Sequence, residues 1–212
     1  MVNANMFADP FGDGSNPLGV SYGAIYIATA ISAVVGTILA GILSNLPLAQ
    51  ASGMGLYYLF GLTIDDFYVQ LNIQVVSPFE AFGEFCSMSL FRVIKDGFDF
   101  SSYTEAHGAA NLALTIATTA LAFCMVDMFD TLGTLYAACE RADLLDEKGD
   151  PLNRNEGMLS DAIATTIGAL CGTSTVTTFS EVNAGVAAGG RTGLTSVFCG
   201  IFFFISMLVL TH

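Results

Sequence analysis

The stretch that decides the fold is Met125-Val126-Asp127-Met128-Phe129-Asp130-Thr131. It places two carboxylates, Asp127 and Asp130, inside a run whose neighbouring residues on both sides are uncharged. The i, i+3 spacing sets both acids on one helix face, which Thr131 and Thr134 continue. A carboxylate in hydrocarbon costs several kcal/mol, so membrane chains rarely keep one without a use for it. We expect this polar face to line a cavity or to contact other helices rather than lipid.

The composition indicates an integral membrane protein. Of the 212 residues, 53% are hydrophobic and 12% are charged, whereas soluble domains average about 25% charged residues. The mean hydropathy is +0.64. A transmembrane helix needs about 20 predominantly apolar residues. Tracts of about this length or more, without Asp, Glu, Lys or Arg, occupy residues 14–64, 106–126, 162–180 and 192–212. We therefore expect a multi-pass protein of the plasma membrane, surrounded by the lipid bilayer.

The charged residues exclude one class of partner and orient the chain. A net charge of −13 argues against nucleic acid, which needs a basic surface. Three of the six basic residues, Arg141, Lys148 and Arg154, share the polar stretch 140–161. Because Lys and Arg mark cytoplasmic loops, we expect this stretch to be cytoplasmic. Residues 1–16 are polar and acidic and lack the basic start of a secretory signal.

No cofactor is predicted. The cysteines are odd in number and form no CxxC pair, and the histidines, His107 and His212, have no metal-ligand spacing. Most of the cysteines lie in apolar segments, where a free cysteine behaves as a small packing residue. We expect neither a disulfide framework nor a metal site from Cys86, Cys124, Cys139, Cys171 and Cys199.

The chain divides into three parts, at residues 1–60, 61–108 and 109–212. The first and last are apolar, and the middle part is a polar connecting segment in which acids and bases lie among aromatic residues. Small residues within the first helix would allow close helix packing. Hydrophobic patterning and capping residues predict helices over residues 21–44, 79–94 (amphipathic), 111–138, 161–170 and 194–210.

Two apolar segments, 45–58 and 172–190, are interrupted. In the first, Pro47 blocks helix continuation, so we expect a short extended piece followed by a short helix. In the second, the β-branched and hydroxyl residues of 173–179 favour extended backbone, and a short helix follows Glu181. A pair of broken hydrophobic segments in corresponding halves is the best sequence pointer to the binding site of a secondary transporter.

Four stretches carry a resemblance to a known family: NLPLAQASGMGL (45–56), FCMVDMFDTLGTL (123–135), LSDAIATTIGALCGTSTVTT (159–178) and GVAAGGRTGL (185–194). They resemble the nucleobase–cation symporter-2 family, specifically its AzgA-like branch of guanine, hypoxanthine and adenine permeases. The resemblance implies an all-α membrane fold of two inverted seven-helix repeats. In that fold two half-helices, each preceded by a short strand, meet near the centre of the bilayer.

The resemblance also implies a function and a set of site residues. It implies uptake of a purine nucleobase, coupled to a proton or to Na⁺, with a homo-oligomer as a further expectation. Asp127 matches an acid that helps to bind the purine, and Asp130 a second acid that supports the site. Glu181 matches a glutamate that hydrogen-bonds the base, and the strand that holds Thr177 and Thr178 would add backbone and hydroxyl contacts. Burial favours the protonated form of a carboxylic acid, so a proton could bind and leave with the substrate.

The chain departs from the family pattern in three ways. Tyr57 stands where the family has a polar Asn, and Val182 and Asn183 change the neighbours of Glu181. The chain is also about half the expected length, so we expect a partial, internally deleted permease with a fragment of each repeat.

Three other interpretations remain. The chain could be a transport-incompetent membrane remnant. The two acids could be purely structural, with their charge satisfied by neighbouring hydroxyls. An intramembrane aspartyl protease is disfavoured, because its two carboxylates normally face each other from separate helices, and Asp127 and Asp130 share one.

Overall fold

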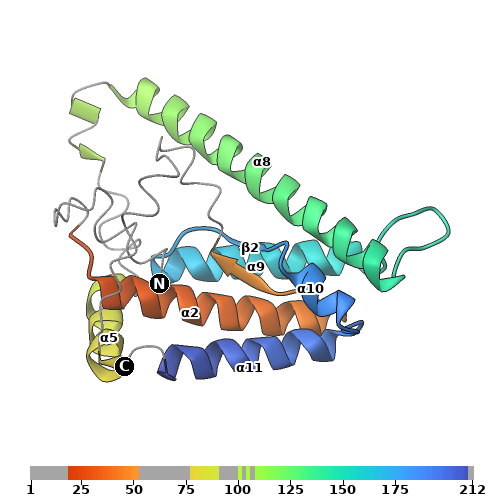
Figure 1. The fold of residues 1–212 in the computed structure, drawn as a ribbon. Helices are drawn as coiled ribbons and strands as arrows, with labels where there is room; N and C mark the ends of the chain where they lie inside the picture. The colour runs from red at the N-terminus through yellow and green to blue at the C-terminus, as the bar shows by residue number, and fades with distance from the viewer. Residues whose placement is uncertain (1–18, 53–76, 91–99, 102–103, 106–107, 210–212) are drawn as a thin grey trace, which may run out of the picture.

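The computed structural model describes residues 19–52, 77–90, 100–101, 104–105 and 108–209 (Figure 1). The regular secondary structure of the described part is helical apart from two three-residue strands. The expected short helix after residue 52, with Tyr57, and most of the connecting segment lie outside the described residues. In chain order the elements are α2 (Tyr22–Leu39), η1 (Ala40–Ser44), β1 (Gln50–Ser52), α5 (Pro78–Glu84), η2 (Phe85–Ser89), α8 (Ala109–Ala142), α9 (Arg154–Cys171), β2 (Val176–Thr178), α10 (Val182–Ala187) and α11 (Gly193–Val209).

Helix α2 is the centre of the fold. It continues without a break into the π-helical turn η1, so the helix expected over residues 21–44 is confirmed. It ends where Asn45 adopts a left-handed backbone with φ of 53°. Ser21 holds the position before the first turn, but its hydroxyl bonds to Glu84 of α5 rather than capping its own helix. Helices α9, α11 and α5 all pack against α2 (Figure 1).

Small residues allow α11 to approach the end of α2 closely. A Cβ atom on Gly41 would lie 2.5 Å from the carbonyl oxygen of Gly193, and a Cβ on Gly200 would lie 2.7 Å from Cγ1 of Ile38. No side chain fits at such distances. The expectation that small residues of the first helix allow close packing is therefore met at Gly41. In α11, Gly193 and Gly200 have the same effect.

Helix α8 diverges from the other helices and contacts them through its C-terminal third (Figure 1). Its buried residues, which begin at Thr131, are Thr131, Leu135, Ala138, Cys139 and Ala142. The apolar part before them is exposed, with large side chains such as Leu114, Leu121 and Phe129 facing outward. By length and composition, the segments Tyr22–Ser44 and Ala109–Ala142 could each cross a membrane.

The polar stretch between α8 and α9 is shorter than the sequence suggests. Helix α8 extends to Ala142, and α9 begins at Arg154, so the expected start of a helix at Asp161 is wrong. Asp161 lies in the second turn of α9, and its side chain is buried. The connection itself is a tight hairpin in which Leu145 pairs with Pro151. This correction moves Asp161 from the expected first residue of a helix to the buried face of a longer one.

Candidate functional site

The two interrupted segments meet in a single two-stranded sheet. Strands β1 and β2 pair antiparallel, with Gln50 opposite Thr178 and Ser52 opposite Val176. Both strands are largely buried. Extended backbone inside a membrane protein requires hydrogen-bond partners from the protein itself. The strands provide them to each other, as the resemblance led us to expect.

The hydroxyl face of α8 contacts strand β2. Thr134 donates a hydrogen bond of 3.0 Å to the backbone oxygen of Thr178, and the hydroxyls of Thr131 and Thr177 lie 2.9 Å apart. Both pairs join residues more than 40 positions apart in sequence. The polar face of α8 therefore contacts other elements, as its spacing predicted.

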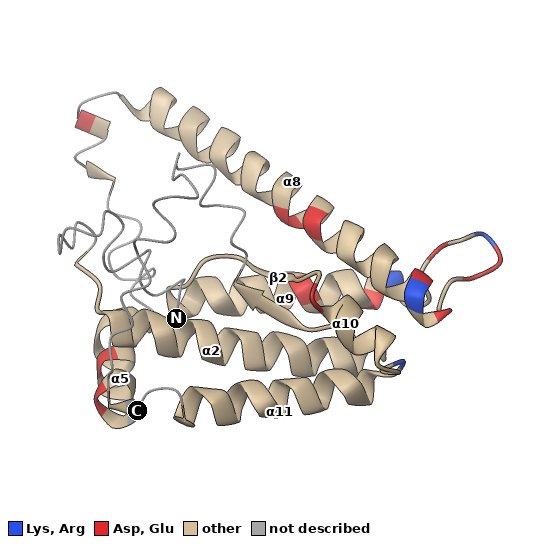
Figure 2. Ribbon diagram, viewed as in Figure 1, with Lys and Arg blue, Asp and Glu red and all other residues tan. Residues whose placement is uncertain are grey.

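The two acids of α8 lie at the edge of this contact. Asp127 is half-buried; its Oδ2 accepts a 3.4 Å bond from Thr165 of α9, whereas its Oδ1 is buried and has no hydrogen-bond partner among the described residues. Asp130 is exposed and accepts a 3.4 Å bond from Thr177. Figure 2 shows these acids as an interruption in the long uncharged part of α8, while many other charges gather at the α8–α9 connection.

Asp161 is a central residue of the site that the sequence analysis did not select. Its side chain is 3% exposed, and it accepts hydrogen bonds from Thr131 at 2.8 Å and from the amide of Gln50 at 3.2 Å. Gln50 is itself fully buried. A signal was present: Asp161, Thr165 and Gly168 are spaced i, i+4, i+7, which marks one helix face. This face was not recognised because the residues before Asp161 were expected to form a loop.

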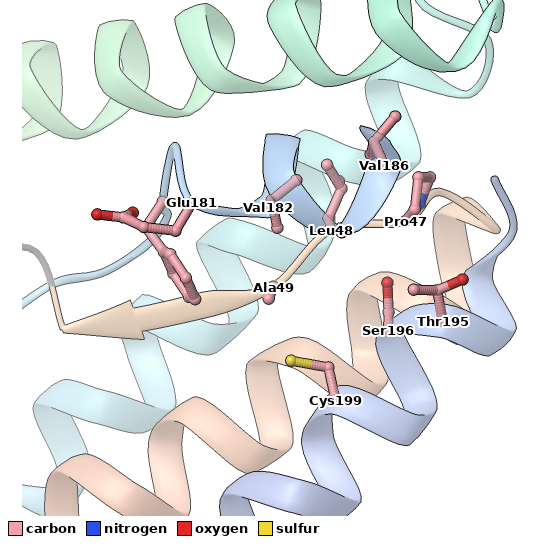
Figure 3. Close-up of a pocket in the computed structure, with 11 residues that line it drawn as sticks. Pro47, Leu48, Ala49, Glu181, Val182, Val186, Thr195, Ser196 and Cys199 are labelled. Atoms are coloured by element: carbon pink, nitrogen blue, oxygen red, sulfur yellow. The ribbon is translucent and has the colours of Figure 1, made fainter. Parts of the chain in front are cut away.

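Glu181 lies apart from this network. It directly precedes α10, its side chain is exposed, and its carboxylate accepts a bond from the hydroxyl of Ser180 at 3.4 Å. It also borders a mainly apolar pocket formed by the segment before β1, helix α10 and helix α11. In Figure 3 its carboxylate points away from Thr195 and Ser196 at the other end of this pocket.

The structure thus brings four of the five expected site residues together. Thr177 bonds Asp130, Asp127 bonds Thr165, whose hydroxyl also bonds the backbone oxygen of Val176 in the same strand, and the backbone oxygen of Thr178 accepts a bond from Thr134 of α8. Glu181 shares no hydrogen-bond partner with these residues in the described part. It is near them in sequence only, shortly after strand β2 ends at Thr178. Residues of the described part hold no group of three or more His, Cys, Asp or Glu side chains suited to a metal ion.

Several buried polar atoms around β1 and β2 have no hydrogen-bond partner among the described residues. They include Oδ1 of Asp127, Oε1 of Gln50 and Oγ1 of Thr178. Most buried polar groups in proteins are paired, so each of these atoms requires an explanation, and a ligand is one. Oε1 of Gln50 faces Gly36 of α2, whereas Asp127 lies on α8 and Thr178 on β2. Oδ1 of Asp127 is an acceptor, and the hydroxyl of Thr178 can donate or accept.

Known proteins resemble this chain over most of its length. The model of the permease family matches residues 24–211. The chain is 48% identical over 100 residues to a protein of Methanocaldococcus jannaschii, which covers 47% of this chain and 22% of that protein. It is 40% identical over 96 residues to the adenine permease AdeQ of Escherichia coli, covering 45% of this chain and 22% of the relative.

A third relative aligns over a longer part of the chain. The guanine/hypoxanthine permease PbuO of Bacillus subtilis is 35% identical over 136 residues, covering 64% of this chain and 25% of the relative. The alignments thus span a quarter or less of the length of each of these relatives. The chain belongs to the permease family, a family of transporters rather than of enzymes, and its relatives include proteins named as adenine and as guanine/hypoxanthine permeases.

Proposed function

We propose that this chain carries the nucleobase-binding elements of a multi-pass plasma-membrane purine permease that couples uptake to protons. The observation that carries the proposal is the unpartnered Oδ1 of Asp127, buried beside a strand pair built from the two interrupted segments. Relatives named for adenine and for guanine and hypoxanthine support a purine as the substrate.

The chemistry of a purine matches the site. Its N–H groups are donors that a carboxylate can accept, and its ring nitrogens and exocyclic oxygen are acceptors for hydroxyl groups. Asp127 would accept from the base, while Thr178 would donate to it through its unpartnered hydroxyl. Glu181, which directly precedes α10, would accept from another edge of the base.

Coupling to protons follows from the electrostatics of the site. Asp130 and Asp161 lie within one hydrogen-bonded network, and Asp127 bonds Thr165, one turn after Asp161 on α9. The ion pairs found among the described residues, Arg154–Asp150 and Arg191–Asp143, do not involve these acids. Because no basic neighbour among the described residues balances the three carboxyl groups, a bound proton relieves their mutual repulsion. We propose the proton as the coupling ion, with Na⁺ as the alternative that the test must exclude.

The test is uptake of radiolabelled hypoxanthine by cells that lack their own purine uptake and express this chain. We expect saturable uptake that a protonophore abolishes and that removal of Na⁺ leaves intact. Glu181→Gln and Asp127→Ala should each reduce uptake at least about tenfold, because each removes a hydrogen bond to a charged group. Glu147→Gln, on the exposed α8–α9 connection, is the matched control and should not change uptake. Unchanged uptake in both site variants would overturn the assignment.

A second candidate is a membrane protein that binds the purine but does not transport it by itself. The exposed apolar half of α8 favours this candidate, because further helices or another copy of the chain would have to cover it within a complete transporter. Purine binding to isolated membranes, without uptake by intact cells, would support this candidate and rule out transport by the isolated chain.

A further inference from the structure

The carboxyl group of Asp161 begins a chain of hydrogen bonds that ends at Asp130. Thr131 donates to Asp161 at 2.8 Å, the hydroxyls of Thr131 and Thr177 are 2.9 Å apart, and Thr177 reaches Asp130 at 3.4 Å. The two threonines come from different elements, α8 and β2. Two carboxyl groups, one buried and one exposed, are therefore connected through two hydroxyls.

A hydroxyl carries a single proton, which restricts the direction of this chain. When Asp161 is ionised it can only accept, so the proton of Thr131 points toward it. Thr131 is then an acceptor for Thr177, whose own proton is directed to Thr131 at 2.9 Å rather than to Asp130 at 3.4 Å. Asp130 then receives no hydrogen bond from Thr177.

A proton on Asp161 permits the opposite direction. The acid can then donate to the oxygen of Thr131, whose proton turns to Thr177, and the proton of Thr177 turns to Asp130. Only the C–O bonds of the two threonines rotate, and the single proton gained is the one on Asp161. The amide of Gln50 donates to the other oxygen of Asp161 in both states.

We propose that Asp161 is a positioning residue whose proton reverses the Thr131–Thr177 hydrogen-bond chain and thereby presents a donor to Asp130 in the purine site. The inference rests on the proposed function, because Asp130 acts there beside Asp127. In this proposal Asp161, the buried acid of α9, does not touch the substrate. It links proton binding to substrate binding. Reciprocal linkage then requires that the purine bind more tightly when Asp161 is protonated.

The surroundings of Asp161 fit this task. The charged groups that act on it from α8 are Asp127 and Asp130, both acidic, while β1 contributes the neutral amide of Gln50 and β2 the backbone N–H of Thr178. No basic side chain contacts it among the described residues. The neutral form of Asp161 is therefore accessible. The amide of Gln50 and the backbone N–H of Thr178 hold its carboxyl group in one orientation in either state.

Two variants distinguish the effect of the proton on Asp161 from the effect of the Thr131–Thr177 hydrogen-bond chain, which we call the relay. Asp161→Asn imitates the protonated acid, because its amide N–H₂ can donate to Thr131 while its oxygen still accepts from Gln50. Thr131→Val keeps the size of the side chain and the acid but interrupts the relay. Thr166→Val is the matched control on α9, because the hydroxyl of Thr166 is exposed and bonds its own helix at Ala162.

The first readout is the affinity of membranes carrying the chain for radiolabelled hypoxanthine, measured across pH. We expect the affinity of the unchanged protein and of Thr166→Val to rise at least about tenfold from alkaline to acidic pH. Asp161→Asn should bind within about threefold of the acidic value at every pH. Thr131→Val should likewise lose the pH dependence. A pH dependence in Asp161→Asn equal to that of the unchanged protein would overturn the inference.

The second readout does not need the purine. Infrared difference spectra between acidic and alkaline pH should contain the C=O band of a protonated, buried carboxylic acid. Asp161→Asn should lack this band, and Thr131→Val should keep it at a shifted frequency. If the unchanged protein shows the band but does not bind purine, the proposed function fails; if it binds purine but the band survives in Asp161→Asn, only the role of Asp161 fails.

Discussion

The side-chain amide of Gln50 donates a hydrogen bond to the carboxylate of Asp161 at 3.2 Å, across 111 positions of sequence. Gln50 opens strand β1, and its backbone N–H and C=O both bond the hydroxyl of Thr37 in α2. The bond to Asp161 adds helix α9 to this group. One buried glutamine thus joins the central helix, the strand pair and the acid-bearing helix.

Replacing Gln50 should weaken the protein without changing its backbone pairing. Gln50→Leu keeps most of the volume but leaves the carboxyl group of Asp161 without one of its donors. We expect a loss of about 1–3 kcal/mol, the usual cost of leaving a buried polar group unsatisfied. The measurement is the temperature at which the detergent-solubilised chain loses its monodisperse elution peak. Ser206→Ala removes an exposed hydroxyl that bonds its own helix, and it should leave this temperature unchanged.

The contact between η1 and α11 should not tolerate a methyl group. Gly193→Ala would push a Cβ atom against the carbonyl of Gly41 and to 2.8 Å from the Cα of Asn45, and neither backbone can move away easily. Overpacking of this kind costs about 1–3 kcal/mol. Gly133→Ala is the control, because a Cβ there meets nothing within 4 Å, and alanine favours a helix over glycine. Equal melting temperatures for the two variants would show that the close approach does not exist.

Local patterns were sufficient for the parts of the fold that depend on nearby residues. The i, i+3 and i+4 spacing of Asp127, Asp130 and Thr131 predicted a polar face on α8, and Thr131 is indeed buried against other elements. The β-branched residues before Phe179 predicted extended backbone, which the structure has at Val176–Thr178. In each case the physical cause lies within one turn or one strand.

Long-range relationships were less accessible. The pairing of Gln50 with Thr178 joins two segments whose own residues do not specify a register, and only the family resemblance implied that they meet. Asp161 was missed because the charged residues before it resemble a loop. They form the first turns of α9, which begins directly after Asn153 in a left-handed conformation. Burial of a single acid depends on which elements surround it, and helix periodicity alone does not define them.

Thr165 should hold strand β2 and Asp127 in place together. Its hydroxyl donates to the backbone oxygen of Val176 at 2.7 Å and lies 3.4 Å from Oδ2 of Asp127. In Thr165→Val the backbone oxygen of Val176 loses its donor and Oδ2 of Asp127 loses its polar neighbour, so we expect purine affinity to fall about tenfold, corresponding to about 1.4 kcal/mol. Binding of radiolabelled hypoxanthine to membranes measures the change. Thr118→Val, whose hydroxyl bonds only backbone oxygens of α8 in the described part, should bind as the unchanged chain does.

The orientation of α8 gives a prediction that does not depend on the substrate. At about 1.5 Å per residue, its 34 residues span about 50 Å, which exceeds the roughly 30 Å of the hydrocarbon core. In the proposed permease α8 crosses the bilayer, so its two ends reach water on opposite sides of the membrane. Because Arg141, Lys148 and Arg154 lie at or beyond its C-terminal end, that end should be cytoplasmic.

Single cysteines can test this orientation after the native cysteines are replaced. A cysteine in Lys148→Cys, on the exposed connection after α8, should react with a membrane-impermeant maleimide in inside-out vesicles but not in intact cells. A cysteine in Asn111→Cys, at the start of the same helix, should show the reverse pattern. Labelling of both positions from one side would mean that α8 does not cross the bilayer. Asp127 and Asp130 would then not lie within the bilayer, and the proposed transport function would be ruled out.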